Sequence, residues 1–114
     1  MHELSIAEGI VDIVERTAKA NGLAKVKTVR VAIGRLAGVE VDSLRFAWIS
    51  ARMGSAAAEA ELVIEEPEGK AWCMDCARTV ALPRFGEACP HCGGYHLTPT
   101  DGMQMKVLDI VGEG

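Results

Sequence analysis

The stretch CMDCARTVALPRFGEACPHC, residues 73–92, holds every cysteine of the chain. The cysteines form two Cys-x2-Cys pairs, Cys73 with Cys76 and Cys89 with Cys92, which are twelve residues apart. Zinc binds four thiolates in a tetrahedron at about 2.3 Å, and a two-residue spacer lets one tight turn offer two sulfurs to the same ion. The spacing therefore predicts a zinc-binding module, with Thr79–Leu82 as a short strand between the turns. Four cysteines leave no open coordination position for water or substrate, so we expect the zinc to be structural.

Two other uses of paired cysteines are weaker predictions. A redox Cys-x2-Cys pair is expected at the start of a helix in a β–α–β unit, and the surrounding sequence lacks that pattern. Four thiolates also hold iron, because ligand type alone does not separate the two metals. We expect His91, inside the second pair, to face solvent. His96 is expected on an exposed loop, where it is a minor candidate for a second metal.

Two helices are predicted before the cysteines. The first begins at Ser5–Glu8, which fits a capping box in which the two side chains bind free backbone N–H groups, or one turn earlier, at Glu3. It ends at Asn21-Gly22, because glycine readily adopts the left-handed conformation that stops a helix. The second begins at Asp42 or Ser43 and ends at Gly54. The expected apolar faces are Ile6, Ile10, Ile13, Val14 and Ala18 in the first helix, and Leu44, Trp48 and Ala51, flanked by Phe46 and Ile49, in the second.

Strands are predicted on both sides of the cysteine segment. Residues 26–33 alternate, with Val29, Val31 and Ile33 on one face, and strand character returns at residues 61–65 and 103–111. The predicted fold class is α+β: two helices on a small β-sheet with an inserted four-cysteine zinc-ribbon module. Residues 1–69 are expected to form one domain, completed by the C-terminal strand 103–114, and residues 70–102 to form the zinc-binding module.

The composition of the chain argues against several classes of function. The chain has 114 residues, a net charge of −4 and 4% aromatic residues. An acidic chain with few aromatic side chains lacks the positive surface and stacking groups typical of nucleic-acid binding. No apolar run approaches the roughly 20 residues that span a membrane, so we expect a cytoplasmic protein with reduced cysteines. We find no nucleophile–base set, phosphate-binding glycine motif or open catalytic metal position, and therefore expect no enzyme activity.

The chain opens with Met1-His2-Glu3. An α-amine has a pKa of about 7.7–8.0 and histidine one of about 6.5, so both offer lone pairs near neutral pH. The Met1 amine, the His2 amide and imidazole nitrogens and the Glu3 amide nitrogen can surround one ion as a planar set of four. This geometry suits Ni²⁺ or Cu²⁺ and disfavours tetrahedral Zn²⁺. It requires that Met1 be retained, which the large side chain of His2 favours.

Four motifs, taken together, resemble the HypA/HybF family. They are Met1-His2-Glu3-Leu4-Ser5, the segment GRL at residues 34–36, the segment EVDSLRF at residues 40–46, and the two cysteine pairs, in order along the chain. The resemblance implies a nickel metallochaperone that binds Ni(II) around His2, with Glu3 and Met1, and holds structural Zn(II) through the four cysteines.

The same resemblance implies delivery of nickel for maturation of nickel–iron hydrogenase. It implies a HypB-type GTPase and the hydrogenase large subunit as partners, and some relatives also serve urease. The alternative function is a zinc-ribbon module that binds proteins or nucleic acids.

Overall fold

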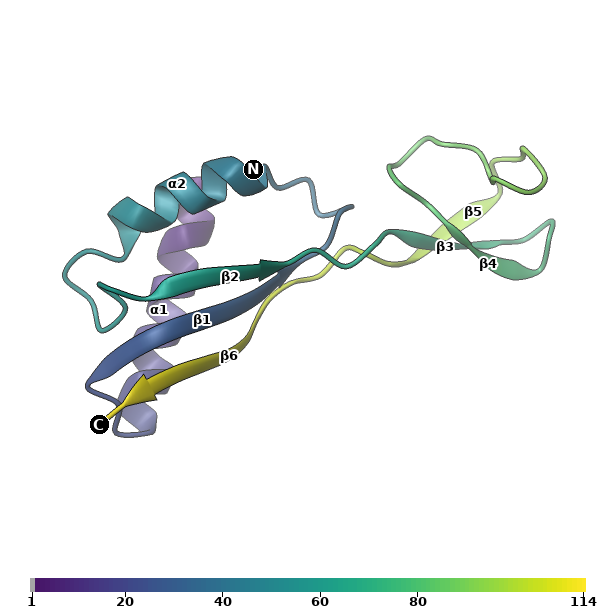
Figure 1. The fold of residues 1–114 in the computed structure, drawn as a ribbon. Helices are drawn as coiled ribbons and strands as arrows, with labels where there is room; N and C mark the ends of the chain where they lie inside the picture. The colour runs from purple at the N-terminus through teal and green to yellow at the C-terminus, as the bar shows by residue number, and fades with distance from the viewer. Residues whose placement is uncertain (1) are drawn as a thin grey trace. The chain divides into compact units, whose positions relative to one another are not determined.

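The computed structural model describes residues 2–114, and Figure 1 shows the fold. The helices are α1 (Glu3–Ala20) and α2 (Val41–Ala51). The strands are β1 (Lys25–Ile33), β2 (Glu61–Glu65), β3 (Lys70–Cys73), β4 (Arg78–Ala81), β5 (Leu97–Asp101) and β6 (Met105–Glu113). The chain divides into two compact units. The first comprises the chain up to Val31, Val39–Ile64 and Lys106–Gly114, and the second comprises Ala32–Gly38 and Glu65–Met105.

The strands form two three-stranded sheets, with the orders β2-β1-β6 and β4-β3-β5. Strand β6 pairs with β1, although the whole second sheet lies between them in the sequence. The chain therefore returns to the first sheet after the cysteine segment. Helix α1 lies behind this sheet in Figure 1, and α1 and α2 pack against each other. The predicted α+β class is confirmed.

Helix α1 begins at Glu3, the earlier of the two predicted starts. Its N-cap is His2, and Ser5 and Glu8 lie inside the helix, so the predicted capping box is wrong. The helix extends back because no residue between Glu3 and Glu8 breaks a helix and the carboxylate of Glu3 is favourable in the first turn. Its end is as predicted: Gly22 has a φ of 66°, and the N–H of Leu23 reaches back to the Ala18 carbonyl at 2.9 Å.

The buried face of α1 differs from the predicted one at three residues, because Ala7 is buried and Ile6 and Ile13 are not. Ala7, Ile10, Val14 and Ala18 are buried, whereas Ile13 is 41% exposed. The observed spacing of three, four and four residues follows the helical repeat more closely than the predicted set.

Helix α2 also starts before its predicted N-cap. Glu40 occupies the N-cap position, and its carboxylate accepts a hydrogen bond from the Asp42 N–H at 3.4 Å. Asp42 and Ser43 therefore lie within the helix. Leu44 and Trp48 are buried, as predicted.

The second unit contains more strand than the sequence indicated. Only one strand was expected there, at Thr79–Leu82, and β4 is found at nearly that place, at one edge of the sheet. The central strand β3 and the opposite edge strand β5 were not predicted. Trp72 of β3 lies opposite Thr79 in β4 and Thr98 in β5. Two small clusters form the core: Leu36, Ala71 and Leu82 in one, and Cys73, Val80 and Cys89 in the other.

Backbone segments of the second unit meet at glycines. A Cβ atom on Gly34 would collide with the backbone of Gly102, and one on Gly102 would lie 2.6 Å from the Cα atom of Gly69. These positions need glycine because the strands and loops approach too closely for a side chain. Among residues 2–114, neither helix is long and apolar enough to cross a membrane.

Candidate metal centres

The four cysteines come together in the second unit. Cys73 ends β3, Cys76 lies in the turn that follows, and Cys89 and Cys92 lie between β4 and β5. Their sulfur atoms are all within 4.8 Å of one another. The Sγ atoms of Cys73 and Cys92 are 3.7 Å apart, and those of Cys76 and Cys89 are 3.9 Å apart. A tetrahedron with metal–sulfur bonds of about 2.3 Å has edges of about 3.8 Å, so this spacing fits a four-thiolate metal centre.

Each cysteine pair lies on a tight backbone turn. In the first turn the N–H of Cys76 donates to the sulfur of Cys73 at 3.4 Å, and the N–H of Ala77 donates to the Cys73 carbonyl at 2.8 Å. In the second, the N–H of Gly93 donates to the Cys89 carbonyl at 2.9 Å. Ala77 and Gly93 have φ values of 53° and 72°, so both turns close with a left-handed residue. A backbone N–H that points at sulfur favours the thiolate form.

The thiols have different acidities. Hydrogen bonding with the Cys92 thiol, followed by burial, raises the pKa of Cys76 to about 12. Hydrogen bonding by the backbone of Cys92, and less by that of His91, lowers the pKa of Cys89 to about 7. Four thiolates this close repel one another unless a cation lies among them. The donor set and its spacing therefore fit a bound divalent ion such as zinc, which would displace the remaining protons.

The two histidines beside this centre are exposed, as predicted. Nε2 of His91 lies 3.1 Å from Nη2 of Arg78, and Nδ1 of His96 lies 3.0 Å from Oδ2 of Asp75. In the described part of the chain, the four cysteines are the only group of three or more ligating side chains that converge. The geometry gives no support to a second metal at His96.

The beginning of α1 leaves backbone nitrogens available. His2 is exposed, and its side chain makes no capping hydrogen bond. Among the described residues, the helical hydrogen bonds begin with that of the Ile6 N–H to the His2 carbonyl at 3.1 Å. The amide nitrogens of His2 and Glu3 therefore precede the hydrogen-bonded part of the helix. Met1, the third predicted nickel-binding residue, lies outside the described residues.

The side chain of Glu3 has a contact that sequence reasoning missed. Its Oε2 atom accepts a hydrogen bond from the Glu40 N–H at 3.3 Å, which links the first turn of α1 to the N-cap of α2. No pattern within either segment indicates this contact, because it depends on how the two helices pack. The carboxylate is thus positioned by α2, and the Glu3 amide nitrogen remains the atom suited to a planar nitrogen site.

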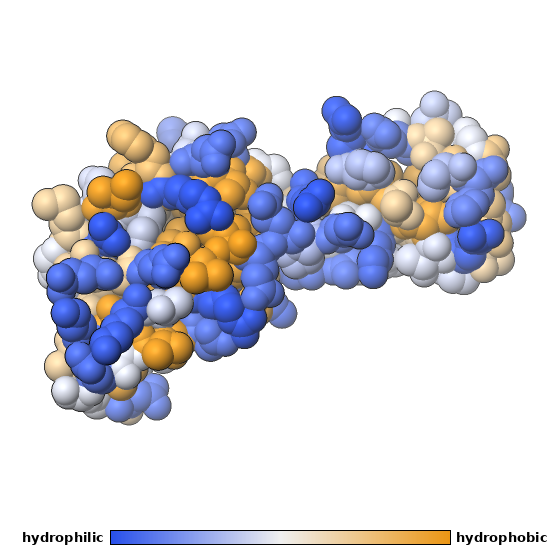
Figure 2. All heavy atoms as spheres, in the orientation of Figure 1, coloured by the Kyte–Doolittle hydropathy of each residue, from blue (hydrophilic) through white to orange (hydrophobic). Residues whose placement is uncertain are grey.

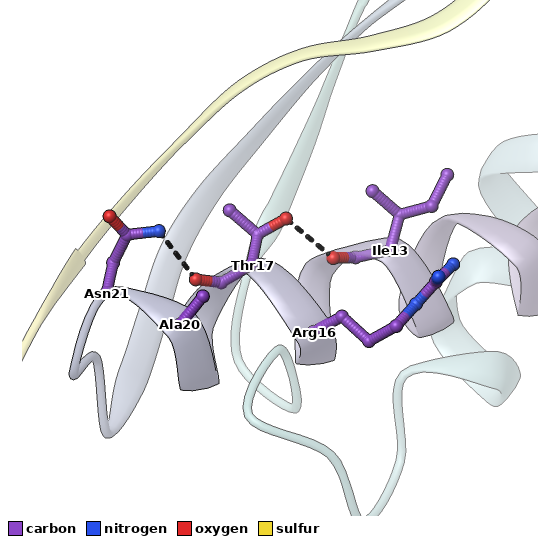
Figure 3. Close-up of a pocket in the computed structure, with 5 residues that line it drawn as sticks. All are labelled: Ile13, Arg16, Thr17, Ala20 and Asn21. Atoms are coloured by element: carbon purple, nitrogen blue, oxygen red, sulfur yellow. Dashed lines mark hydrogen bonds between the residues drawn. The ribbon is translucent and has the colours of Figure 1, made fainter.

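A hollow of about 410 Å³ lies along the C-terminal half of α1, as Figure 3 shows. It is lined by Ile13, Arg16, Thr17, Ala20 and Asn21. The polar side chains of Thr17 and Asn21 donate to backbone carbonyls one turn earlier. None of the lining residues is a Cys, His, Asp or Glu, so the hollow is not a metal site.

Comparison with known proteins places the chain in a family. The family model described as "Hydrogenase/urease nickel incorporation, metallochaperone, hypA" matches residues 1–112. A curated relative from Xanthobacter autotrophicus, named Hydrogenase maturation factor HypA, is 46% identical over 110 residues, which cover 96% of this chain and 97% of the relative. A protein of the same name from Cupriavidus necator is 45% identical over 113 residues, covering 99% and 95%.

Solved structures show the same fold. The solution structure of the Ni metallochaperone HypA from Helicobacter pylori matches with a TM-score of 0.70 and 24% identity, covering 99% of this chain and 98% of that one. At this identity the likeness bears on the fold alone.

Proposed function

This chain belongs to the HypA family of nickel-incorporation metallochaperones for hydrogenase maturation, and we propose that it binds Ni(II) at its N-terminus and delivers the ion to a nickel–iron hydrogenase. The proposed ligands are the Met1 amine, the His2 amide and imidazole nitrogens, and the Glu3 amide nitrogen. One observation carries this proposal: His2 is exposed at the start of α1, with its amide and that of Glu3 ahead of the first helical hydrogen bond. A planar set of four nitrogens at this place selects Ni²⁺ over tetrahedral Zn²⁺.

The proposed site suits transfer of the ion. It lies at an exposed chain end, where a recipient can approach the metal directly. Metal ligands must be deprotonated, so protons compete with nickel for the amine and the imidazole, and the affinity for nickel falls as pH falls. The contact between the Glu3 carboxylate and the Glu40 N–H fixes the start of α1 without occupying a nitrogen ligand.

We assign structural Zn(II) to Cys73, Cys76, Cys89 and Cys92. The sulfur spacing supports this assignment, and four thiolates fill the coordination sphere of zinc. When bound, zinc supplies a cross-link between the two cysteine turns and no catalytic chemistry. We divide the chain accordingly into a nickel-binding domain, residues 1–69 with 103–114, and a zinc-binding module, residues 70–102.

The protein would act as a carrier and not as an enzyme. Nucleotide hydrolysis in the delivery step would come from a HypB-type GTPase partner, and the hydrogenase large subunit would be the recipient. Four reduced cysteines suit a cytoplasmic location, where thiols stay free to bind metal.

A nickel-transfer assay tests the proposal. Nickel-loaded protein is mixed with the nickel-free precursor of the hydrogenase large subunit, and incorporated nickel is measured in the wild type, in His2→Ala and in His96→Ala. We expect His2→Ala to lose transfer while keeping its fold and zinc. His96→Ala serves as the matched control, because it removes an exposed histidine that belongs to the second unit and is not a proposed nickel ligand. Equal transfer by wild type and His2→Ala would contradict the proposal.

A further inference from the structure

Helix α2 carries apolar side chains on two opposite faces. Leu44 and Trp48 face the core. Phe46, Ile49 and Met53, which we call the α2 stripe, are 79%, 56% and 74% exposed. Phe46 and Ile49, three residues apart in α2, lie on the side of the helix opposite the buried pair, and Met53 lies in the turn that follows the end of the helix at Ala51. Figure 2 shows orange and tan side chains along the outer edge of the first unit, over α2.

A basic flank runs beside the α2 stripe. Arg45 and Arg52 are seven residues apart and therefore lie on the same side of the helix. Nη1 of Arg45 donates to the Leu62 carbonyl at 3.5 Å, and Nη1 of Arg52 donates to the Ala60 carbonyl at 2.9 Å. These bonds hold both guanidinium groups at the start of β2, and each group retains further N–H donors because a guanidinium has five.

Glu59, one of the acidic residues near this flank, is already engaged. Lys25 lies 2.8 Å from the Glu59 carboxylate and is the main cause of the lowered pKa of Glu59, to which Arg52 contributes less. The positive charge of the flank is thus not cancelled by a direct ion pair with Glu59. On a chain with a net charge of −4, the side of α2 with the two arginines is a local basic surface.

We propose that the α2 stripe binds an amphipathic helix of a partner protein that carries acidic residues beside its apolar seam. Within α2, Asp42, Phe46 and Ile49 follow the four-three spacing of a coiled-coil seam, and Met53 adds an exposed apolar side chain in the turn after the helix. A helix is therefore the segment whose side chains fit between them. Acidic residues on the partner helix would meet Arg45 and Arg52. This surface uses none of the proposed nickel or zinc ligands, so the inference goes beyond the proposed function and does not depend on it.

The charges disfavour a second copy of α2 as the occupant. An antiparallel pair with Phe46 against Ile49 of the other copy would place Arg45 beside the Arg52 of that copy. A parallel pair would place the two Asp42 side chains against each other in the seam. Like charges at such positions destabilise helix pairing, whereas acidic residues in a different partner would stabilise it.

Two synthetic helical peptides test the proposal. Both carry leucine at the seam positions; one has glutamate and the other lysine at the flanking positions. Binding to the full-length protein is measured by fluorescence anisotropy at low and moderate salt. The net charge of −4 would favour the lysine peptide if the attraction were unspecific. We expect tighter binding of the glutamate peptide, by at least tenfold at low salt.

Variants locate the binding surface. We expect Phe46→Ala and Ile49→Ala each to weaken binding of the glutamate peptide at least tenfold, while Ile13→Ala changes it less than twofold. Ile13 is a matched control because it is an isoleucine exposed on the other helix. Replacing Arg45 and Arg52 together by glutamine should remove the preference for glutamate, whereas Arg16→Gln, an exposed arginine on α1, should keep it.

Any of four results would overturn the proposal. One is equal or tighter binding of the lysine peptide. Another is that neither peptide binds. A further one is that the α2 variants bind the glutamate peptide as tightly as the wild type, although thermal unfolding shows that these variants are folded. The last is that the wild-type protein self-associates with increasing concentration in analytical ultracentrifugation and that Phe46→Ala abolishes this association. The α2 stripe would then bind a second copy of the chain.

Discussion

Replacing Cys73 by alanine removes one proposed zinc ligand from the interior of the second unit. The Cys73 side chain is fully buried and packs with Val80 and Cys89. Val80 is the only buried hydrocarbon side chain of this cluster, and the partly buried Leu97 packs against it. Burial of a valine contributes about 1.5–3 kcal/mol to the free energy of folding. A structural zinc ion contributes about 10 kcal/mol or more in small zinc-binding domains. Zinc should therefore decide whether this part of the chain is ordered.

Amide hydrogen exchange measures the effect at single residues. In the second unit the Met74 N–H binds the His96 carbonyl at 3.0 Å, and in the first unit the Val26 N–H binds the Ala56 carbonyl at 3.0 Å. A loss of about 4 kcal/mol of local stability speeds exchange about a thousandfold, because each 1.4 kcal/mol is a factor of ten. We expect Cys73→Ala to accelerate exchange at Met74 by about that factor and to change exchange at Val26 less than threefold.

The control for this experiment lies in the same turn. Met74→Ala changes the residue next to Cys73, but it removes an exposed side chain and none of the four cysteine ligands. In this variant the amides of the second unit other than that of residue 74 should stay protected. If those amides, including that of Cys89, stayed protected in zinc-free Cys73→Ala, the argument that zinc holds the module together would be refuted.

Three further predictions concern stability. Gly34→Ala should destabilise the protein by about 1–3 kcal/mol in urea unfolding, because its methyl group would collide with the Gly102 backbone; an unchanged midpoint would contradict this. Ala77→Gly should raise the thermal midpoint of zinc-loaded protein, by about 1 kcal/mol of stability, because glycine adopts a φ of 53° without strain, and a lowered midpoint would count against it. Hydrogen bonding with Arg30 lowers the pKa of Asp109 in the folded protein. This carboxylate therefore stabilises the fold above its unfolded pKa, near 3.8, and its contribution is lost as pH falls through the lower folded pKa. Asp109→Asn should therefore have a lower urea midpoint than wild type at pH 7, and the gap should close towards pH 3; a gap independent of pH would refute the assignment.

The sequence predicted those features that depend on local pattern. Strand β2 is found at the predicted residues 61–65, β1 within one residue at each end, and the stop of α1 at Gly22 follows from its left-handed conformation. The clustering of the cysteines was also predictable, because a Cys-x2-Cys turn brings its own two sulfurs together and a metal ion needs four. In these cases, residues close together in the sequence are sufficient to predict the local structure.

Features that depend on distant contacts were not predictable in the same way. The N-cap of α2 is Glu40, whose N–H binds the Glu3 carboxylate of the other helix. Strand β5 contains Pro99, a residue that argues against a strand in a sequence, yet β5 is an edge strand, where proline is tolerated. Phe46 and Ile49 were expected to flank a buried stripe and instead are exposed, since the core contacts only one side of α2.

The most direct test of the nickel site is a titration of zinc-loaded protein with Ni²⁺ at neutral pH, followed by the d–d absorption bands. It is run on the wild type, on His2→Ala and on a variant with one extra residue before Met1. The planar four-nitrogen site predicts a weak visible band at one nickel per chain that is lost in both variants, with the cysteine-bound zinc retained. An equal band in the extended variant would exclude the Met1 amine as a ligand, and an equal band in His2→Ala would contradict the proposed site altogether.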